Sequence, residues 1–357
     1  MQRSTEKIKP RLSTQMKDKS KKKDIEYEND GPYEGDFGNV ISTGSTLLDL
    51  AISGSRVRGG GLPGGIVVEA SGPSQSGKTA LLTEIAGQIE RKGGDSQFND
   101  PEARLDEEFA RLFGMKLEKK NYHRPDTVTE LFSNIIAWQP KPTKENAVNA
   151  IFGDSLAALS TNIEMGEDEG DKMGMRRAKE FSEGLRKTCR LIKQRNLLLV
   201  CSNQIRINVD AGKYGQKYNT PGGEAFKFYS TVRLRFNTPS KIKDEKSISG
   251  KKVEKVIGME TEIEVIKTCD TPFRKANLVI IYGYGIDDIR ANLQYIKTFK
   301  GYSQYFLGGN ALDKSMEEAI KIVEDDIDLV KELREETIDL WEEIEEKFKT
   351  TRKKIRI

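Results

Sequence analysis

One short segment of the chain has the residue types and the spacing needed to hold a phosphate group. It reads Gly72-Pro-Ser-Gln-Ser-Gly-Lys-Thr79 and matches the pattern G-x-x-x-x-G-K-[ST] in full. Glycines let backbone amides converge on a phosphate, the lysine neutralises its oxygens, and the threonine hydroxyl can complete the shell of a Mg²⁺ ion. An apolar run precedes the segment and a helical pattern follows it, which disfavours the alternative of a glycine-rich surface turn. The predicted nucleotide-binding residues are Gly72, Pro73, Ser74, Gln75, Ser76, Gly77, Lys78, Thr79 and Ala80.

Two carboxylates could complete this site. An apolar run ends at Asp154, which at the carboxyl edge of a parallel sheet would hold the metal together with Thr79. An acid after an apolar strand is often only a loop residue, so this assignment depends on its pairing with the phosphate cradle. Glu102 falls between the two motifs and is the natural candidate for positioning an attacking water. On spacing alone, a solvated loop acid explains Glu102 equally well.

The composition excludes several other kinds of chemistry. The 357 residues include one histidine, His123, and three scattered cysteines, Cys189, Cys201 and Cys269. Zinc sites built from His and Cys, Ser-His-Asp triads and disulfide frameworks are therefore excluded. No apolar run approaches the ~18–20 residues that cross a bilayer, and the N-terminus is polar, so we expect a cytoplasmic protein with no membrane partner. The formal net charge is only +3, so nucleic-acid binding would have to rest on local basic patches.

Alternating apolar and amphipathic segments predict an α/β fold. The expected strands are 66–70, 148–152, 197–202, 232–236, 262–267 and 277–282, and the expected helices are 78–92, 127–137 and 176–193. Thr127 followed by Glu130 fits a capping box at the start of one helix. The strand–helix alternation indicates a mostly parallel central sheet flanked by helices, whereas the short connections later in the chain indicate an antiparallel edge.

Three regions of the chain differ in character. Residues 1–40 form a basic N-terminal arm that should be largely disordered over its first thirty residues, either a solubilising tail or a segment for polyanion binding or oligomerisation. Residues 41–285 carry the motifs and form the core domain. Residues 286–357 form a small helical domain, in which the spacing of apolar residues over 316–349 predicts one long amphipathic helix or a helical pair. We expect this region to pack on the core rather than to form a coiled coil.

Further motifs resemble the RecA family of homologous recombinases, the bacterial-type strand-exchange ATPases, phage-encoded members included. They are Ile41-Ser-Thr-Gly-Ser, Leu47-Leu-Asp49, Gly61-Leu-Pro-Gly-Gly, Cys201-Ser-Asn-Gln-Ile-Arg206 and Gly222-Gly-Glu-Ala-Phe-Lys-Phe-Tyr-Ser-Thr-Val-Arg233. The similarity covers about residues 41–285 in motif order. It implies a RecA-type P-loop ATPase that hydrolyses Mg-ATP to ADP and phosphate in a DNA-dependent way. It also implies helical filaments on single-stranded DNA, and homologous pairing and strand exchange with double-stranded DNA in recombination and repair.

The resemblance also implies roles for individual residues around the nucleotide. Glu102 falls where the family keeps a glutamate that activates water, and Gln204 looks like the γ-phosphate sensor. Lys267 matches a lysine that reaches the nucleotide of the neighbouring subunit. The implied catalytic residues are therefore Glu102, Lys78, Gln204 and Lys267.

Other implied positions concern the base and the contact between subunits. Asp106 and Phe109 match the residues that hold and stack the adenine. Tyr282 and Gly283 resemble a segment that lies near the nucleotide across the subunit interface. The residues implied at the interface itself are Lys227, Phe228 and Arg233.

Two glycine-punctuated loops, about 160–175 and 206–221, resemble the family's DNA-binding loops. Cations that take phosphates, interleaved with apolar and aromatic side chains that separate or stack bases, suit single-strand binding. Without the resemblance, such a Gly/Lys/Tyr loop is more often a mere connection. The implied DNA-binding residues are Met173, Gly174, Arg176, Arg206, Val209, Lys213, Lys217, Gly222 and Gly223.

The chain also departs from the family pattern. The family keeps two lysines one residue apart, but the second position here is Cys269, and the following loop is one residue shorter. The first DNA-binding loop is unusually acidic, and the C-terminal end is basic rather than acidic. These departures keep two alternatives open: a regulator or mediator of recombination with weak hydrolysis, and a RecA-fold helicase or repair ATPase without strand exchange.

Overall fold

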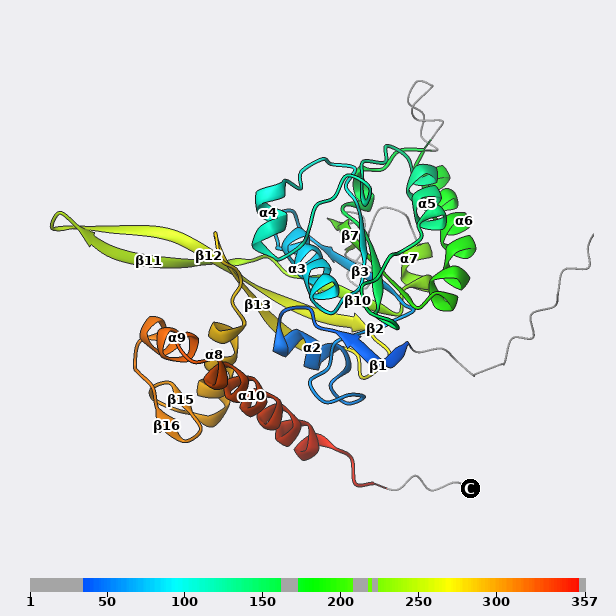
Figure 1. Cartoon of the computed structure of the whole chain (residues 1–357). Coiled ribbons are helices and arrows are strands. Elements are labelled where there is room, and N and C mark those ends of the chain that lie inside the picture. Colours follow the sequence, from blue (N-terminus) through cyan, green and yellow to red (C-terminus); the bar gives the residue numbers. More distant parts are fainter. Residues whose placement is uncertain (1–34, 162–172, 208–217, 220–223, 353–357) are drawn as a thin grey trace, which may run out of the picture. The chain divides into compact units, whose positions relative to one another are not determined.

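A large mixed sheet forms the centre of the chain. The computed structural model describes residues 35–161, 173–207, 218–219 and 224–352. In spatial order the parallel strands are β10 (Val232–Phe236), β3 (Val67–Gly72), β7 (Leu197–Gln204), β6 (Asn149–Gly153), β4 (Ser96–Asn99) and β5 (Tyr122–His123). Beyond β10 follow the antiparallel strands β12 (Lys251–Lys267), β13 (Lys275–Ile281) and β14 (Gly285–Ile286), with β11 (Ser240–Ile248) paired to β12 (Figure 1). The predicted α/β fold with an antiparallel edge is confirmed.

Helices cover both faces of this sheet because its central strands are apolar on both sides. The helices are α2 (Thr46–Ser53), α3 (Lys78–Arg91), α4 (Glu107–Leu112), α5 (Val128–Ala137), α6 (Met173–Gln194) and α7 (Glu224–Tyr229). Successive residues of β7 alternate between two apolar clusters: Leu198 and Val200 pack in the cluster of α3, and Leu199 packs in that of α5 and α6. The predicted capping box of Thr127 and Glu130 begins α5. No described helix combines the length and the apolar character that would let it span a membrane.

The C-terminal region is helical, as expected, and of the two predicted arrangements over 316–349 it contains the helical pair. It contains α8 (Asp288–Lys300), β15 (Phe306–Leu307), β16 (Asn310–Ala311), α9 (Met316–Glu324) and α10 (Ile327–Phe348). The break between the last two helices lies at Asp326, whose side chain accepts a hydrogen bond from the Asp328 amide and so begins α10 anew. Ile338 and Trp341 of α10 pack on Leu50 of α2, so the region packs on the core.

In the hairpin of β11 and β12, the sequence predicted only the inner end of β12, residues 262–267. Its outer part alternates lysine and glutamate with few apolar residues, and most of its side chains are exposed. A pattern of this kind is typical of a solvated loop, so periodicity alone could not reveal it. The remaining short elements are β1 (Asp36–Ile41), β2 (Leu62–Gly64), β8 (Arg206–Ile207), β9 (Tyr218–Asn219) and the 3₁₀ turn Leu156–Ala158.

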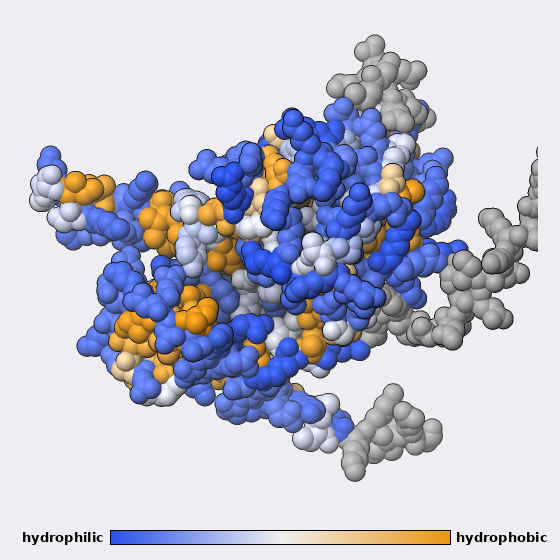
Figure 2. Space-filling view, viewed as in Figure 1, coloured by the Kyte–Doolittle hydropathy of each residue, from blue (hydrophilic) through white to orange (hydrophobic). Residues whose placement is uncertain are grey.

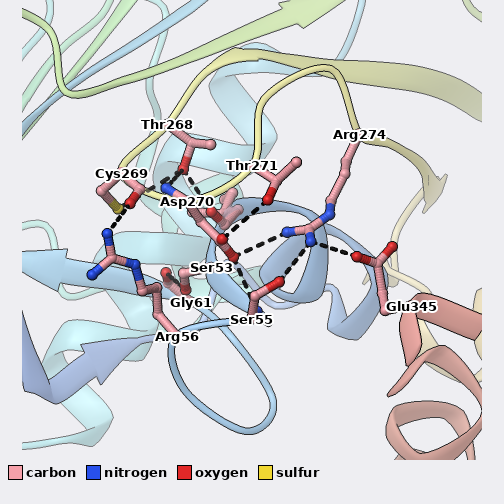
Figure 3. A network of polar contacts seen from close by, with 11 residues as sticks. Ser53, Ser55, Arg56, Gly61, Thr268, Cys269, Asp270, Thr271, Arg274 and Glu345 are labelled. Carbon is pink, nitrogen blue, oxygen red and sulfur yellow. Dashed lines mark hydrogen bonds and ion pairs between the residues drawn. The ribbon is translucent and has the colours of Figure 1, made fainter. Parts of the chain in front are cut away.

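A polar network joins the turn between β12 and β13 to α2 and α10 (Figure 3). Asp270 pairs with Arg274 at 3.0 Å and accepts a hydrogen bond from the Ser55 amide at 3.0 Å. Arg274 also donates to Ser55 Oγ at 2.6 Å, pairs with Glu345 of α10 and lies 4.9 Å over the ring of Trp341. An arginine that pairs with two carboxylates and stacks on an aromatic ring fixes the geometry of all three partners. The network therefore holds the C-terminal helix against the edge of the core.

Asp49 of α2 makes the free energy of unfolding depend on pH. Its buried carboxylate accepts hydrogen bonds from the Thr43 amide and hydroxyl, both at 2.7 Å, yet burial raises its pKa from 3.8 to about 7. Because the folded pKa exceeds the unfolded one, the stabilisation is present at low pH and is lost as the pH rises through 7. Between about pH 6 and pH 8, ionisation of Asp49 alone should lower the free energy of unfolding by about 1.4 kcal/mol.

The variant Asp49→Asn tests this prediction, because asparagine does not ionise. Urea titrations at both pH values give the free energy of unfolding of the parent and of Asp49→Asn. From about pH 6 to about pH 8, that of the parent should fall by about 1.4 kcal/mol relative to that of the variant. A difference that stays constant over that range would contradict the raised pKa.

Candidate functional site

The phosphate loop connects the end of β3 to the start of α3. Gly77 occupies the N-cap position of α3 with φ +94° and no side-chain cap, so the first amides of the helix stay available for an anion. A Cβ at Gly72 would lie 2.6 Å from Cβ of Phe236, so only glycine lets the loop pass there. The loop therefore has the cradle that a nucleotide phosphate requires, and it fits the predicted ligand.

Lys78 folds back over this loop. Its Nζ donates to the carbonyls of Gly72 at 3.2 Å and Pro73 at 2.6 Å. Burial lowers the pKa of Lys78, while the nearby carboxylates Asp154 and Glu102 oppose that shift. The ammonium group is thus held among backbone carbonyls at the mouth of the cradle, where phosphate oxygens would be a stronger partner.

Asp154 lies directly after β6 and next to Thr79. The Ser202 hydroxyl donates to its carboxylate, and the Thr79 side chain is hydrogen-bonded to it as well. Burial raises the pKa of Asp154 despite these two hydrogen bonds. A buried carboxylate beside a threonine hydroxyl is the ligand pair predicted for Mg²⁺, and a cation there would relieve the unfavourable burial of its charge.

Glu102 lies beside Asp154, although the two residues are far apart in the chain. The Ser155 hydroxyl donates to Glu102 Oε1 at 3.2 Å, and Arg104 pairs with Oε2 at 2.8 Å. The Glu102 side chain is only 16% exposed, which rules out the solvated loop acid that spacing had left open. Glu102 therefore lies in the same pocket as Lys78 and Thr79.

The pocket around these groups has a volume of about 520 Å³ and one apolar side. Phe109 lies in this lining as expected, and Leu112 and Phe113 at the end of α4 join it. The sequence did not predict Leu112 or Phe113, although their spacing from Phe109 was a usable signal. The lining also includes Met259, Ile280, Ile281, Tyr282, Gly283 and Gly285. The pocket thus combines a polar phosphate end with an apolar end suited to a base.

Residues 33–287 match a protein-family model described as the RecA N-terminal domain. The chain belongs to the RecA family. Proteins of this family bind nucleotide with Mg²⁺ and DNA, assemble into filaments and act in recombination and repair.

Three further residues of the RecA nucleotide site were expected near the base or the interface. Asp106 begins α4, where its carboxylate accepts a hydrogen bond from the Phe109 amide at 2.7 Å and so positions Phe109 at the pocket. It is not among the residues that line the pocket, and its contact with a base stays a prediction. Tyr282 and Gly283 line the pocket of their own chain, and their place near a subunit interface stays a prediction.

Gln204 connects the RecA pocket to a buried ion pair. The pairing of β7 with β3 places Gln204 opposite Gly72, and Gln204 lines the pocket. Its neighbour Asn203 donates to Glu69 Oε1 at 3.1 Å, and Arg233 donates to Glu69 Oε2 at 2.7 Å. The Arg233 side chain is only 14% exposed because it pairs with Glu69, and the place expected for it at a subunit interface stays a prediction.

The remaining expected interface and trans residues lie away from this pocket. Phe228 of α7 is 77% exposed, and Lys227 pairs with Glu224 on the same helix. Lys267 does not line the pocket of its own chain. Its Nζ donates to the carbonyls of Lys227 at 3.1 Å and Phe228 at 3.2 Å. Any contact of Lys267 with a nucleotide therefore requires a second RecA subunit.

The expected DNA-binding residues are only partly described. Met173, Gly174 and Arg176 begin α6, and Arg206 begins β8. Val209, Lys213, Lys217, Gly222 and Gly223 lie outside the described residues. The structure adds a basic face on α6, formed by the side chains of Arg176, Lys179, Arg186, Lys187 and Arg190, which make no ion pair with described residues. Spacings of three, four and seven residues are typical of one helix face, so the sequence carries a signal for this basic face.

The basic face of α6 yields a prediction about salt dependence. Arg186→Ala should weaken single-stranded DNA binding for all sequences alike and lower the slope of log K against log salt concentration by about 0.7–1. The measurement is a fluorescence-anisotropy titration at several salt concentrations. Lys331→Ala, which removes a cation that pairs with Asp328 on α10, is the matched control and should leave the slope unchanged.

Proposed function

We propose that this RecA-family chain is a DNA-dependent ATPase and recombinase. It assembles as a helical filament on single-stranded DNA and exchanges that strand with a homologous duplex. The observation that carries the proposal is the convergence of Lys78, Thr79, Asp154, Glu102 and Gln204 on one pocket at the carboxyl edge of the sheet. We assign the core to residues 41–285, the basic arm to 1–40 and the helical domain to 286–357.

The pocket residues have distinct parts in the proposed hydrolysis. Bound Mg-ATP supplies the phosphoryl group that water attacks. Lys78 and the amides at the start of α3 neutralise charge on the phosphates, and Thr79 with Asp154 would hold the Mg²⁺ ion. Glu102 orients the attacking water and accepts its proton, with Ser155 and Arg104 fixing the carboxylate.

Gln204 is proposed to pass the nucleotide state to the DNA-binding segment that follows it. It lies in the pocket and immediately precedes residues 206–221 in the chain. Lys267 is proposed to act on the nucleotide of a neighbouring copy, and the exposed Phe228 to pack into that copy. In this arrangement ATP joins two subunits and strengthens the hold on DNA.

A second candidate is a regulator or mediator with weak hydrolysis. The observation that favours it is the single lysine at 267, since Cys269 occupies the other position and its carbonyl accepts a hydrogen bond from Arg56 at 3.0 Å. The turn at 268 is also tied to α2, because Thr268 donates to the Ile52 carbonyl at 2.6 Å. A turn held in this way has little freedom to supply a second cation.

Joint-molecule formation distinguishes these functions. The recombinase should convert single-stranded DNA and a homologous duplex into joint molecules in the presence of ATP, but should not do so with a heterologous duplex. Electron microscopy with a non-hydrolysable ATP analogue should show helical filaments on single-stranded DNA. Filaments without joint molecules would favour the regulator, and unwinding without joint molecules would favour a helicase. The proposal would be overturned if the affinity for DNA were the same with and without nucleotide and no filaments formed.

A further inference from the structure

The hairpin of β11 and β12 extends far beyond the sheet that carries the nucleotide pocket. The two strands pair along the whole length of β11, from the pair Ser240–Glu260 to the pair Ile248–Lys251. One register shift lies between Ile242 and Lys243. A strand of nine residues spans roughly 30 Å. Figure 1 shows this arm leading away from the helices that cover the sheet. An arm of this length has no core of its own to pack against.

On one face of the hairpin, lysines and glutamates of the two strands form ion pairs with each other. Lys243 pairs with Glu254 at 2.8 Å, and Lys252 pairs with Glu245 at 2.7 Å across the two strands. Both of these lysines therefore have a partner within the hairpin. Pairs of this kind keep the face soluble and give a partner little to recognise.

The opposite face is cationic and partly apolar. By strand register its members are Asp244, Lys246, Ile248, Lys251, Val253 and Lys255, which we call the cationic hairpin face. Ile248 is 59% exposed and Val253 is 45% exposed, and Figure 2 shows apolar atoms on the arm. Lys251 and Lys255 have no ion-pair partner among the described residues. This face thus offers an aliphatic centre bordered by unpaired positive charge.

These features favour a protein partner over a phosphate backbone. A surface that binds only phosphates needs cations and polar groups, and exposed Ile and Val would stay in water. A protein interface places apolar side chains at its centre and charges at its rim. The partner should therefore carry exposed aliphatic side chains among acidic groups, so that charges are complementary.

The chain itself carries such a surface where α9 ends and α10 begins. Ile322 is 39% exposed and Ile327 is 66% exposed. Six acidic residues and one lysine lie near them in the chain, and all of these residues are exposed. We call this surface the acidic corner; its residues are Glu317, Glu318, Lys321, Ile322, Glu324, Asp325, Asp326, Ile327 and Asp328.

We propose that the cationic hairpin face of one copy docks on the acidic corner of a second copy, an inference that rests on the proposed self-assembly. The two surfaces differ, so the contact is heterologous. Each copy can bind one neighbour through its hairpin and another through its acidic corner, and the contact can therefore repeat along a polymer. Ile248 and Val253 pack against Ile322 and Ile327, and Lys251 and Lys255 face the surrounding acids.

Both surfaces are connected to the turn that lines the nucleotide pocket. The Tyr282 amide donates to the Ile257 carbonyl at the base of the hairpin at 2.9 Å. The Tyr284 hydroxyl donates to Glu324 of the acidic corner at 2.9 Å. A shift of this turn on nucleotide binding would therefore move both surfaces, so the contact couples the pockets of successive copies.

Charge reversal in the full-length protein tests this contact. In sedimentation velocity with ATP and without DNA, Lys251→Glu/Lys255→Glu should lower the apparent association constant at least about tenfold, and Glu317→Lys/Asp325→Lys should do the same. The chain with all four substitutions should return to within about threefold of the parent. Nucleotide affinity should stay unchanged in all three variants, since none of these residues lines the pocket.

The outcomes separate this inference from the proposed function. If the parent assembles and the variants assemble equally well, or the fourfold variant shows no recovery, the docking inference fails and the recombinase proposal stands. The docking inference also fails if the hairpin variant loses only duplex DNA affinity. If the parent does not assemble without DNA under any nucleotide condition, the docking inference fails, and both proposals fail if it also forms no filament on single-stranded DNA. With an added thiol oxidant that takes up the two electrons and two protons, a mixture of Ile248→Cys and Ile327→Cys chains should form a disulfide-linked dimer more readily than either chain alone, and equal yields would contradict the docking inference.

Discussion

Glu102→Gln should lower DNA-stimulated ATP turnover by about 10²–10⁴-fold while nucleotide affinity stays close to that of the parent. Glutamine keeps the size of the side chain and can still accept the hydrogen bond from Ser155. It cannot accept a proton from water, and it no longer pairs with Arg104 as a charge. Turnover is measured by phosphate release, and affinity by titration with a fluorescent nucleotide.

Two controls make this result specific. Glu107→Gln, on the neighbouring helix α4, removes the same charge from an exposed pair with Arg111 and should change turnover by less than about twofold. Lys78→Ala should lose nucleotide affinity itself, because it removes the cation at the mouth of the cradle. Turnover by Glu102→Gln at the parent rate would remove Glu102 from the mechanism.

Arg233→Ala should lower the free energy of unfolding by about 3–5 kcal/mol. Its partner Glu69 is fully buried between β10 and β7, and the remaining hydrogen bond from Asn203 cannot compensate for the lost guanidinium. The large effect comes from the carboxylate left behind, not from the strength of the pair. Urea unfolding followed by circular dichroism gives the measurement.

The double variant Glu69→Gln/Arg233→Met should therefore lose much less than Arg233→Ala, because no buried charge remains. Arg111→Ala breaks the exposed pair with Glu107 and should cost no more than about 0.5 kcal/mol. A loss below about 1 kcal/mol for Arg233→Ala would contradict the buried pair. Since Asn203 precedes the proposed sensor Gln204, the ATP response of DNA binding should weaken together with stability.

Local sequence patterns were sufficient to predict the elements whose signals lie within one short segment of the chain. The phosphate loop is contiguous, so the residues from Gly72 to Thr79 were recognisable as a unit. The apolar runs that became β3, β6 and β7 are buried on both faces, and the capping box at Thr127 marked the start of α5. Such signals involve residues within a few positions of one another, which is why they can be read without a fold.

The roles of residues that contact distant parts of the chain were harder to predict from the sequence. Asp106 and Arg233 matched positions of known importance in a family, but a carboxylate next to a helix start caps that helix, and an arginine on a central strand meets whatever charge the next strand presents. The outer part of the β11–β12 hairpin had no apolar periodicity to reveal it, because most of its side chains are exposed and no core requires them to be apolar.

By itself the sequence determined the α/β class, the phosphate loop, Asp154 after its strand and the helical C-terminal region, since each depends on neighbours along the chain. Only the tertiary structure decided that Glu102 lies beside Asp154, that Tyr282 lines the pocket of its own chain and that Arg233 neutralises Glu69. These contacts join residues that lie far apart in sequence, and the register of the sheet, not local preference, brings them together.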